Sequence, residues 1–228
     1  MPSYWGGLFA IYWNFKRAPG FFDEVCWSGD GTSGRYITHN LTVAPELIIL
    51  KNRTTFTYQW SVYEKDVFNV GGKYELVLNS DAAQYDINNT NTPFSTATAP
   101  TATQFRLGSG SACNSASSTY VAYLFATLSG VSKVGKYTGT GATQTIDCGF
   151  TSGARFVLIK RTDSIGNWPV FDTARGMGPG TDPVVFLNLT NAEVSVNNVD
   201  TAASGFQLVS ANSDYNANGG TYIYLAIA

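Results

Sequence analysis

Short apolar segments rich in β-branched and aromatic residues recur along the chain. Thr119–Ala126 (TYVAYLFA) is repeated at the end of the sequence as Thr221–Ala228 (TYIYLAIA), and a related segment, Ile11–Phe15 (IYWNF), lies near the start. Each is bounded by Gly, Ser or Pro, and each is too short to be a capped helix. Continuous apolar runs of this length and composition predict strands that are buried on both faces.

The similarity between Thr119–Ala126 and Thr221–Ala228 extends toward the N-terminus over a whole repeat. Further matches follow in the same order: Trp27–Gly31 with Tyr137–Gly141, Leu47–Lys51 with Phe156–Lys160, Trp60–Tyr63 with Trp168–Phe171, Leu76–Asn79 with Val185–Asn188, Phe105–Leu107 with Phe206–Leu208, and Asn114 with Asn216. The spacing differs only within polar loops. The chain is therefore a tandem repeat of roughly 100 residues, the size of a small β-sandwich and not of a solenoid unit.

We therefore predict an all-β fold with two tandem, structurally similar antiparallel β-sandwich domains, residues 19–128 and 129–228. Trp60 and Trp168, like Tyr120 and Tyr222, occupy equivalent positions, so we expect these four residues to be core anchors of the repeats. No segment has a convincing helical period. The expected strands lie near 21–27, 36–41, 46–51, 59–63, 74–79, 104–107 and 120–125, and near 132–137, 145–148, 155–161, 170–172, 184–188, 205–209 and 222–228.

Residues 1–18 form a short N-terminal strand or arm in this prediction. Residues 4–17 resemble the last strand of a preceding repeat that the sequence does not contain, and Ala18-Pro19-Gly20 then breaks the chain. A strand without its own sheet needs another partner. Trp5, Tyr12, Trp13 and Phe15 are therefore candidates for subunit contacts, and for Trp5 and Trp13 a flat face offered to a sugar ring is the alternative.

Charge and cysteine content narrow the classes of protein. Charged residues make up 13% of the chain and the formal net charge is -2, which argues against nucleic acid or anionic lipid as a partner. Aromatic residues make up 14%, more than two small cores need, which suggests subunit contacts or ligand platforms. Three cysteines at non-equivalent repeat positions indicate folding in a reducing cytosol. No apolar run is long enough to span a bilayer.

Few residues suggest catalysis. The single histidine, His39, has no Gly-x-Ser-x-Gly motif to accompany it, so a loop histidine bonded to backbone is the favoured interpretation. Paired acids could cleave glycosidic bonds, and the available ones, mostly at expected strand ends, are Asp23, Glu24, Glu46, Glu64, Asp66 and Asp172. Asp30 lacks the further acids of a calcium loop. We predict no catalytic residue, no metal site and no cofactor.

Two lysines and two loops complete the pattern. Lys51 and Lys160 each close an apolar segment, which suggests lysines that protect a sheet edge. Residues 88–103 are almost all Asn, Thr, Ala, Ser and Pro and are expected to form a mobile surface loop. Residues 175–183 contain the longest Gly/Pro stretch of the chain and are expected to form a second exposed loop.

Several phrases of the sequence match a known family. They are Phe15–Asp23, Gly34–Leu41, Ala44–Ile48, Val157–Asp163, Asn167-Trp168, Phe171–Arg175 and Thr221–Tyr224. Together they resemble a repeated β-domain of uncharacterised function from virion proteins of tailed phages, notably marine and cyanobacterial ones, where it occurs in tail-fibre-like or other appendage proteins. The resemblance covers nearly the whole chain. The family has no established catalytic residues.

The resemblance implies a non-enzymatic virion structural protein, part of a tail fibre or appendage that takes part in host-surface attachment. It would be assembled in the host cytoplasm and act in the virion. Its expected partners are further copies of itself, with a trimer favoured, other virion proteins, and a host-surface glycan bound weakly by the two loops but through many copies. Nucleic acid and membrane insertion are not expected. The alternatives are a capsid decoration or cement protein, latched to its neighbour by the N-terminal strand, and a polysaccharide depolymerase.

Overall fold

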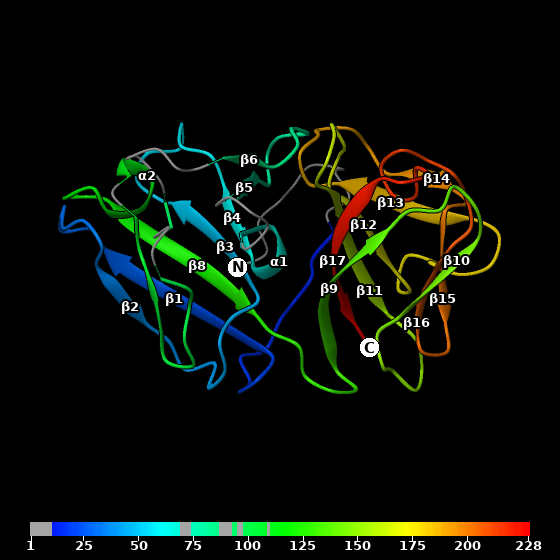
Figure 1. Ribbon diagram of the computed structural model, residues 1–228, viewed down its shortest axis with the longest axis horizontal. Helices are drawn as coiled ribbons and strands as arrows, with labels where there is room; N and C mark the ends of the chain where they lie inside the picture. The colour runs from blue at the N-terminus through cyan, green and yellow to red at the C-terminus, as the bar shows by residue number, and fades with distance from the viewer. Residues whose placement is uncertain (1–10, 69–73, 87–92, 95–97, 109) are drawn as a thin grey trace, which may run out of the picture.

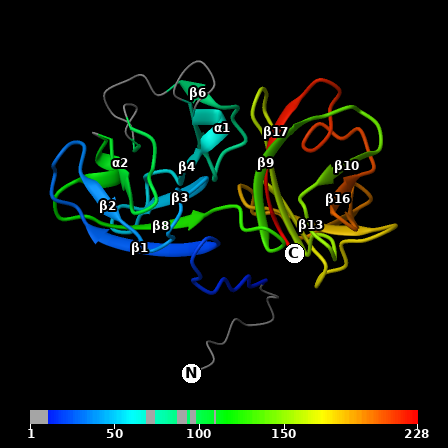
Figure 2. The same cartoon turned by 60° about the horizontal axis from the view of Figure 1, so that its bottom comes forward.

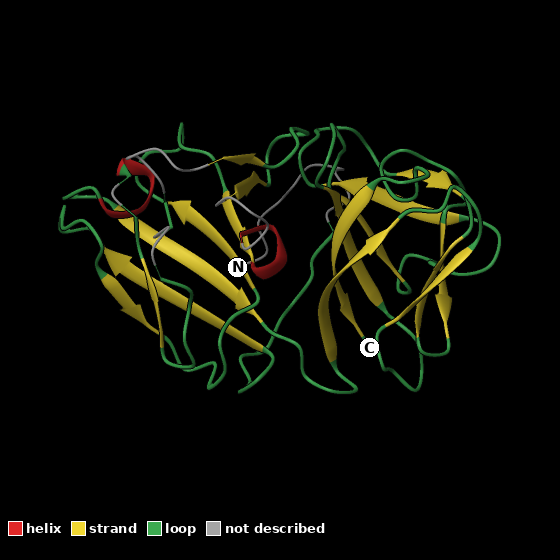
Figure 3. Cartoon of the chain, in the orientation of Figure 1, coloured by secondary structure: helices red, strands yellow, loops and turns green. Residues whose placement is uncertain are grey.

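A computed structural model describes residues 11–68, 74–86, 93–94, 98–108 and 110–228 of the chain. In these residues the chain consists of β-strands, turns and loops with two one-turn helices (Figure 3). No helix in this part of the chain is long and apolar enough to cross a membrane. The all-β sandwich fold predicted from the repeats is confirmed.

The first repeat contains eight of the strands and both helices. In chain order they are β1 (Phe22–Ser28), β2 (Tyr36–Thr38), β3 (Leu47–Asn52), β4 (Ser61–Glu64), α1 (Lys65–Phe68), β5 (Tyr74–Val77), β6 (Tyr85–Asp86), β7 (Gln104–Arg106), α2 (Ser111–Asn114) and β8 (Thr119–Phe125). The second repeat contains β9 (Ser132–Thr138), β10 (Gln144–Asp147), β11 (Phe156–Arg161), β12 (Pro169–Asp172), β13 (Asp182–Phe186), β14 (Val194–Val196), β15 (Val199–Ala202), β16 (Gly205–Leu208) and β17 (Thr221–Ile227).

The large sheets of the two repeats have the same strand order (Figure 1). The large sheet of the first has the strand order β1-β8-β3-β4-β5-β6, and that of the second has the order β9-β17-β11-β12-β13-β14, with every pairing antiparallel. A smaller sheet covers one face of each: β2-β7 in the first repeat and β10-β16-β15 in the second. In each repeat the apolar segment that closes the unit, β8 or β17, is an inner strand of the large sheet.

The two large sheets also pack against each other, which explains why their strands are apolar at successive positions. On β3, Ile48 and Leu50 face the core of the first sandwich, whereas Leu47 and Ile49 belong to a third cluster that joins the repeats. Leu158 on β11 and other residues of the second large sheet complete this cluster. β8 and β17 are therefore buried on both faces, as predicted. The layers run small sheet, large sheet, large sheet, small sheet.

The described part of the N-terminal arm, residues 11–17, differs from the expected strand. It has no regular secondary structure and runs past the end of the layer between the sheets (Figure 2). The Phe15 ring lies 5.6 Å from that of Phe22, 5.4 Å from Phe125 and 5.9 Å from Phe156, centroid to centroid, so it contacts both repeats. The arm is held by side chains and not by a strand ladder.

The prediction that Lys51 and Lys160 protect a sheet edge is wrong. They lie on β3 and β11, which have strand neighbours on both sides. Lys160 is fully buried, and its ammonium group donates to the carbonyl oxygens of Asp81 (2.9 Å) and Gly166 (2.5 Å). Each lysine also faces a tryptophan ring at 5.7 Å, Trp60 for Lys51 and Trp168 for Lys160. The lysine–tryptophan contact is repeated in both units, fully buried in the second and half-buried in the first.

A second repeated feature fixes the corner that precedes β8 and β17. The Tyr120 hydroxyl donates to the Ser111 carbonyl (3.0 Å) and accepts from the Ser115 amide (2.8 Å). In the second repeat the Tyr222 hydroxyl donates to Ser213 (2.9 Å) and accepts from Ala217 (2.8 Å). The same offsets of nine and five residues tie each tyrosine to its loop.

The turn after β1 or β9 is pressed against this corner. Asn216 holds it through its side-chain oxygen, which accepts from the Thr140 amide (2.9 Å), and through its amide nitrogen, which donates to the Ala142 carbonyl (2.7 Å). A Cβ atom at Gly139 would lie 2.3 Å from the Ala217 carbonyl oxygen, and the equivalent Gly29 is equally confined. Only glycine fits at these two positions.

We expect Gly139→Ala to lower the free energy of unfolding by about 1–3 kcal/mol, because backbone must move to admit the methyl group. Gly178→Ala is the matched control, since a Cβ there meets no atom closer than 4.0 Å. Urea unfolding of the two variants measures the difference. Equal stabilities would show that the corner yields without cost.

Candidate binding cleft between the two repeats

The loop that follows β5 holds the second repeat in place. The Trp168 indole nitrogen donates to the carbonyl oxygens of Val77 (2.9 Å) and Ser80 (3.2 Å), and the Gly166 amide donates to that of Asp81 (2.8 Å). The Gln84 amide then donates to the Thr162 carbonyl (3.0 Å). Together with Lys160 these bonds fix the relative position of the repeats along one side of the layer between the sheets.

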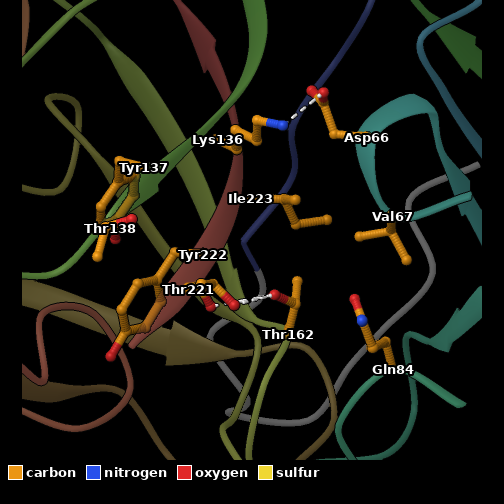
Figure 4. A pocket seen from close by; sticks show the side chains of 10 residues that line it. All are labelled: Asp66, Val67, Gln84, Lys136, Tyr137, Thr138, Thr162, Thr221, Tyr222 and Ile223. Carbon is orange, nitrogen blue, oxygen red and sulfur yellow. Dashed lines mark hydrogen bonds and ion pairs between the residues drawn. The ribbon is translucent and has the colours of Figure 1, made fainter. Parts of the chain in front are cut away.

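Beside this loop the surfaces of the two repeats separate and leave a cleft of about 490 Å³ (Figure 4). The first repeat contributes Asp66 and Val67 from α1, and Gln84. The second contributes three residues of β9, three of β17 and one that follows β11; they are Lys136, Tyr137, Thr138, Thr221, Tyr222, Ile223 and Thr162. The cleft therefore exists only because the repeats pack face to face.

Polar groups lie at both ends of the cleft, with apolar side chains between them. At one end Lys136 Nζ and Asp66 Oδ1 form an ion pair at 3.0 Å. At the other, the Thr162 and Thr221 hydroxyls are 2.7 Å apart. Val67 and Ile223 extend toward each other between these ends (Figure 4).

The chemistry of the cleft suits binding. Its lining carries one cation and one anion, and they neutralise each other. The other polar groups are hydroxyls and one amide, which donate and accept hydrogen bonds without net charge. None of the described lining residues is a histidine, cysteine or serine.

The predicted core anchors are placed as follows. Tyr120 and Tyr222 are buried in the first and second sandwich core, where they stack on Trp27 (5.4 Å) and Tyr137 (5.0 Å). Trp168 is fully buried in the layer between the large sheets. Trp60, its repeat equivalent, is half-buried at the border of that layer.

The predicted subunit-contact residues have different surroundings. Trp5 lies outside the described residues, and Tyr12 is 72% exposed. The Trp13 indole nitrogen donates to Asp172 Oδ2 (2.9 Å), and its ring lies edge-on to Phe156. Trp13 and Phe15 thus contact their own chain, whereas Tyr12 is free to meet another.

His39 is bound within the first repeat. The Leu41 amide donates to Nδ1 (3.2 Å), which leaves the Nε2 hydrogen to donate to the Thr101 carbonyl oxygen (3.2 Å). Burial lowers the pKa of the imidazole, although the Thr101 bond and the charge of Asp23 oppose the shift. A neutral ring with both nitrogens engaged is structural.

The candidate acids mainly accept hydrogen bonds from backbone amides of turns and loops. Glu64 and Asp172 are equivalent by register, and each accepts backbone amides of the turn that follows: Asp66 and Val67 for Glu64, Arg175 for Asp172. Burial raises the pKa of Glu64 to about 7. Burial also acts to raise the pKa of Asp172, but hydrogen bonds from Arg175 and Trp13 outweigh it and hold this pKa below its ordinary value.

The remaining acids are dispersed. Asp23 accepts from the Asn40 amide (2.7 Å), Glu46 pairs with Lys65, and Asp30 accepts from the Asn114 side chain (2.7 Å). Glu24 lines a groove beside the arm. No group of three or more metal-binding side chains comes together within the described part of the chain. Of the proposed acids, only Asp66 lines the cleft.

The two loops expected to be exposed are partly internal. Of residues 88–103, positions 93–94 and 98–103 are described, and Phe94 among them is buried in the first core. Arg175 is fixed by Asp172 (2.6 Å) and Glu193 (2.8 Å), and Met177 is buried. One apolar residue within each polar stretch anchors the loop.

Sequence reasoning missed the cleft because its walls come from distant positions. Gln84, Lys136 and Thr162 carry no motif, and they have no equivalents of the same type in the other repeat. The only usable signal was the apolar run on both faces of the closing strands, which implied a further packed layer but did not identify the second repeat as its partner.

Comparison with known proteins identifies a family but no activity. A family model described as a domain of unknown function (DUF7483) matches residues 17–228 and so spans both repeats in one match. No curated protein and no solved structure matches the chain. The chain belongs to this family, DUF7483, whose function is not known.

Proposed function

We propose that this chain is a non-catalytic structural component of a tailed-phage particle, part of a tail fibre or other appendage that contacts the host surface. The observation that carries the proposal is the use of the chemically versatile side chains for internal bonds. His39 uses both ring nitrogens, Lys160 is buried between carbonyl oxygens, and Glu64 and Asp172 cap turns. Such an arrangement supports a rigid display module rather than a reaction centre.

The phage setting rests on the sequence phrases that resemble appendage proteins, and the low content of charged residues, 13% of the chain, agrees with it. The copies would form a homo-oligomer, a trimer by preference, alongside other virion proteins, and several weak contacts to a host glycan would gain strength from repetition. The packed layer between the two large sheets, with the hydrogen bonds across it (the seam of the two repeats), would hold the binding surfaces of each copy at a constant spacing.

The arm favours the appendage over the capsid-decoration alternative. A decoration protein latched by strand addition needs an arm that is free to join a neighbour's sheet. Here residues 11–17 are bound to their own chain through Trp13 and Phe15.

Gold-labelled antibodies against the recombinant protein, viewed by electron microscopy on the particle that carries it, test the proposal. We expect label on the tail or its fibres. Label over the capsid would overturn the appendage assignment. The purified protein should release no reducing ends from host envelope polysaccharide, and a release abolished by Glu64→Gln or Asp66→Asn would establish a depolymerase instead.

A further inference from the structure

We propose that the cleft between the repeats binds a neutral sugar of the host surface, held between α1 and Gln84 of the first repeat and β9 and β17 of the second. The inference rests on the proposed attachment role and gives it a site and a ligand class. It places the glycan contact in the cleft instead of on the exposed loops.

The cleft offers hydrogen-bonding groups that the protein itself does not use. Among the described residues, the Gln84 side-chain amide and the Thr138 hydroxyl have no hydrogen-bond partner, and both line the cleft. An amide presents two donors and an acceptor, and a hydroxyl presents both functions. Adjacent sugar hydroxyls, which donate and accept alike, match this set.

The charge of the cleft selects against ionic ligands. The Lys136 side chain is 61% exposed and that of Asp66 28%, and the two already satisfy each other at 3.0 Å. A phosphate or uronate would need Lys136 but would meet the carboxylate of Asp66 beside it, and a cation would meet the reverse problem. A neutral ligand can bond to both partners and leave the ion pair intact.

The middle of the cleft suits the carbon skeleton of a sugar. Val67 and Ile223 line the cleft but are only 3% and 4% exposed, so they offer a small apolar surface between the polar ends, against which the C–H groups of a ring can rest. A volume of about 490 Å³ lies within the usual range for small-ligand sites. Both walls are held by the bonds of Trp168, Lys160 and Gln84 across the seam, so the site is formed before the ligand arrives.

Titration of the isotope-labelled protein with cellobiose, lactose, maltose and chitobiose, followed by amide NMR, tests the inference. At least one disaccharide should shift the amides of residues 136–138, 221–223 and 84, with a dissociation constant of about 1 mM, which repeated copies raise to useful avidity. The double variant Gln84→Ala, Thr138→Val should bind about tenfold more weakly. Thr138→Ser, which keeps the hydroxyl, should bind nearly as well as the native protein.

The repeat supplies a matched control. Ser28 is the equivalent of Thr138 at the exposed end of β1 and does not line the cleft, so Ser28→Val should leave binding unchanged. The inference fails if no disaccharide shifts the cleft amides, if the shifts lie elsewhere, if the double variant binds as well as the native protein, or if inorganic phosphate shifts the same amides. Antibody labelling of the particle does not depend on the cleft, so the attachment role and this site can fail separately.

Discussion

Replacing Trp168 with alanine is expected to lower the free energy of unfolding by about 3–5 kcal/mol, as for other fully buried aromatic side chains. The ring fills the layer between the large sheets, faces the Lys160 ammonium group and donates to two carbonyl oxygens of the first repeat. Its loss leaves a cavity and removes the face on which a buried charge depends. Denaturant unfolding measures the change.

The internal repeat again provides the control. Trp60→Ala removes the equivalent ring, but this ring is half-buried, so we expect a loss of about 1–2 kcal/mol. Hydrogen exchange adds a local readout: the Gly166 and Gln84 amides, which donate across the seam, should exchange faster in Trp168→Ala than in Trp60→Ala. Equal effects of the two substitutions would contradict the assignment of Trp168 to the joint between the repeats.

Stability should fall as the pH rises from about 5 to 8. Burial raises the pKa of Glu64 and that of Glu75 to about 7, from 4.5 for the free side chain. Between pH 4.5 and 7 the two carboxyl groups stay protonated in the folded protein but have lost their protons in the unfolded chain. The stabilisation from proton binding is therefore complete below pH 4.5 and disappears as the pH rises past 7. At about 1.4 kcal/mol per pKa unit, the two carboxyls together predict a fall of roughly 2–5 kcal/mol.

Thermal unfolding at a series of pH values checks this expectation. The double variant Glu64→Gln, Glu75→Gln keeps an acceptor for the Asp66 and Val67 amides but cannot ionise. We expect its melting temperature to be nearly constant between pH 5 and 8 and to exceed that of the native protein at pH 8. A native protein that is equally stable at both values, or a variant that retains the slope, would contradict the prediction.

The fold class could be predicted from the sequence because the two repeats could be compared with each other. Closing strands that matched as TYVAYLFA and TYIYLAIA gave the strand type, and the ordered matches before them gave the all-β architecture. The same comparison could have gone one residue further: Glu64 follows Tyr63 as Asp172 follows Phe171, and the structure shows both acids capping the next turn. An acid kept at one place in both repeats was already a sign of structural use.

Other features leave no trace in a linear pattern. The one-turn helices α1 and α2 are too short for a helical period. β6, β14 and β15 are edge strands that are too short to show a clear alternation of apolar and polar residues. The lysines of β3 and β11 suggested an edge because a buried lysine is rare, and only the opposing carbonyl oxygens and tryptophan ring make it tolerable. The cleft depends on two surfaces from different repeats, whose nearest lining residues in the sequence, Gln84 and Lys136, are 52 positions apart.

The face-to-face contact of the large sheets has a consequence for how such repeats can multiply. The large sheet of each repeat has one broad apolar face, and the other repeat covers it. A third repeat therefore cannot pack on this face in the same way. A longer array would have to be extended by pairs of repeats, joined through sheet edges and loops. The structural unit is then the pair of repeats, which agrees with a single family model that matches both of them.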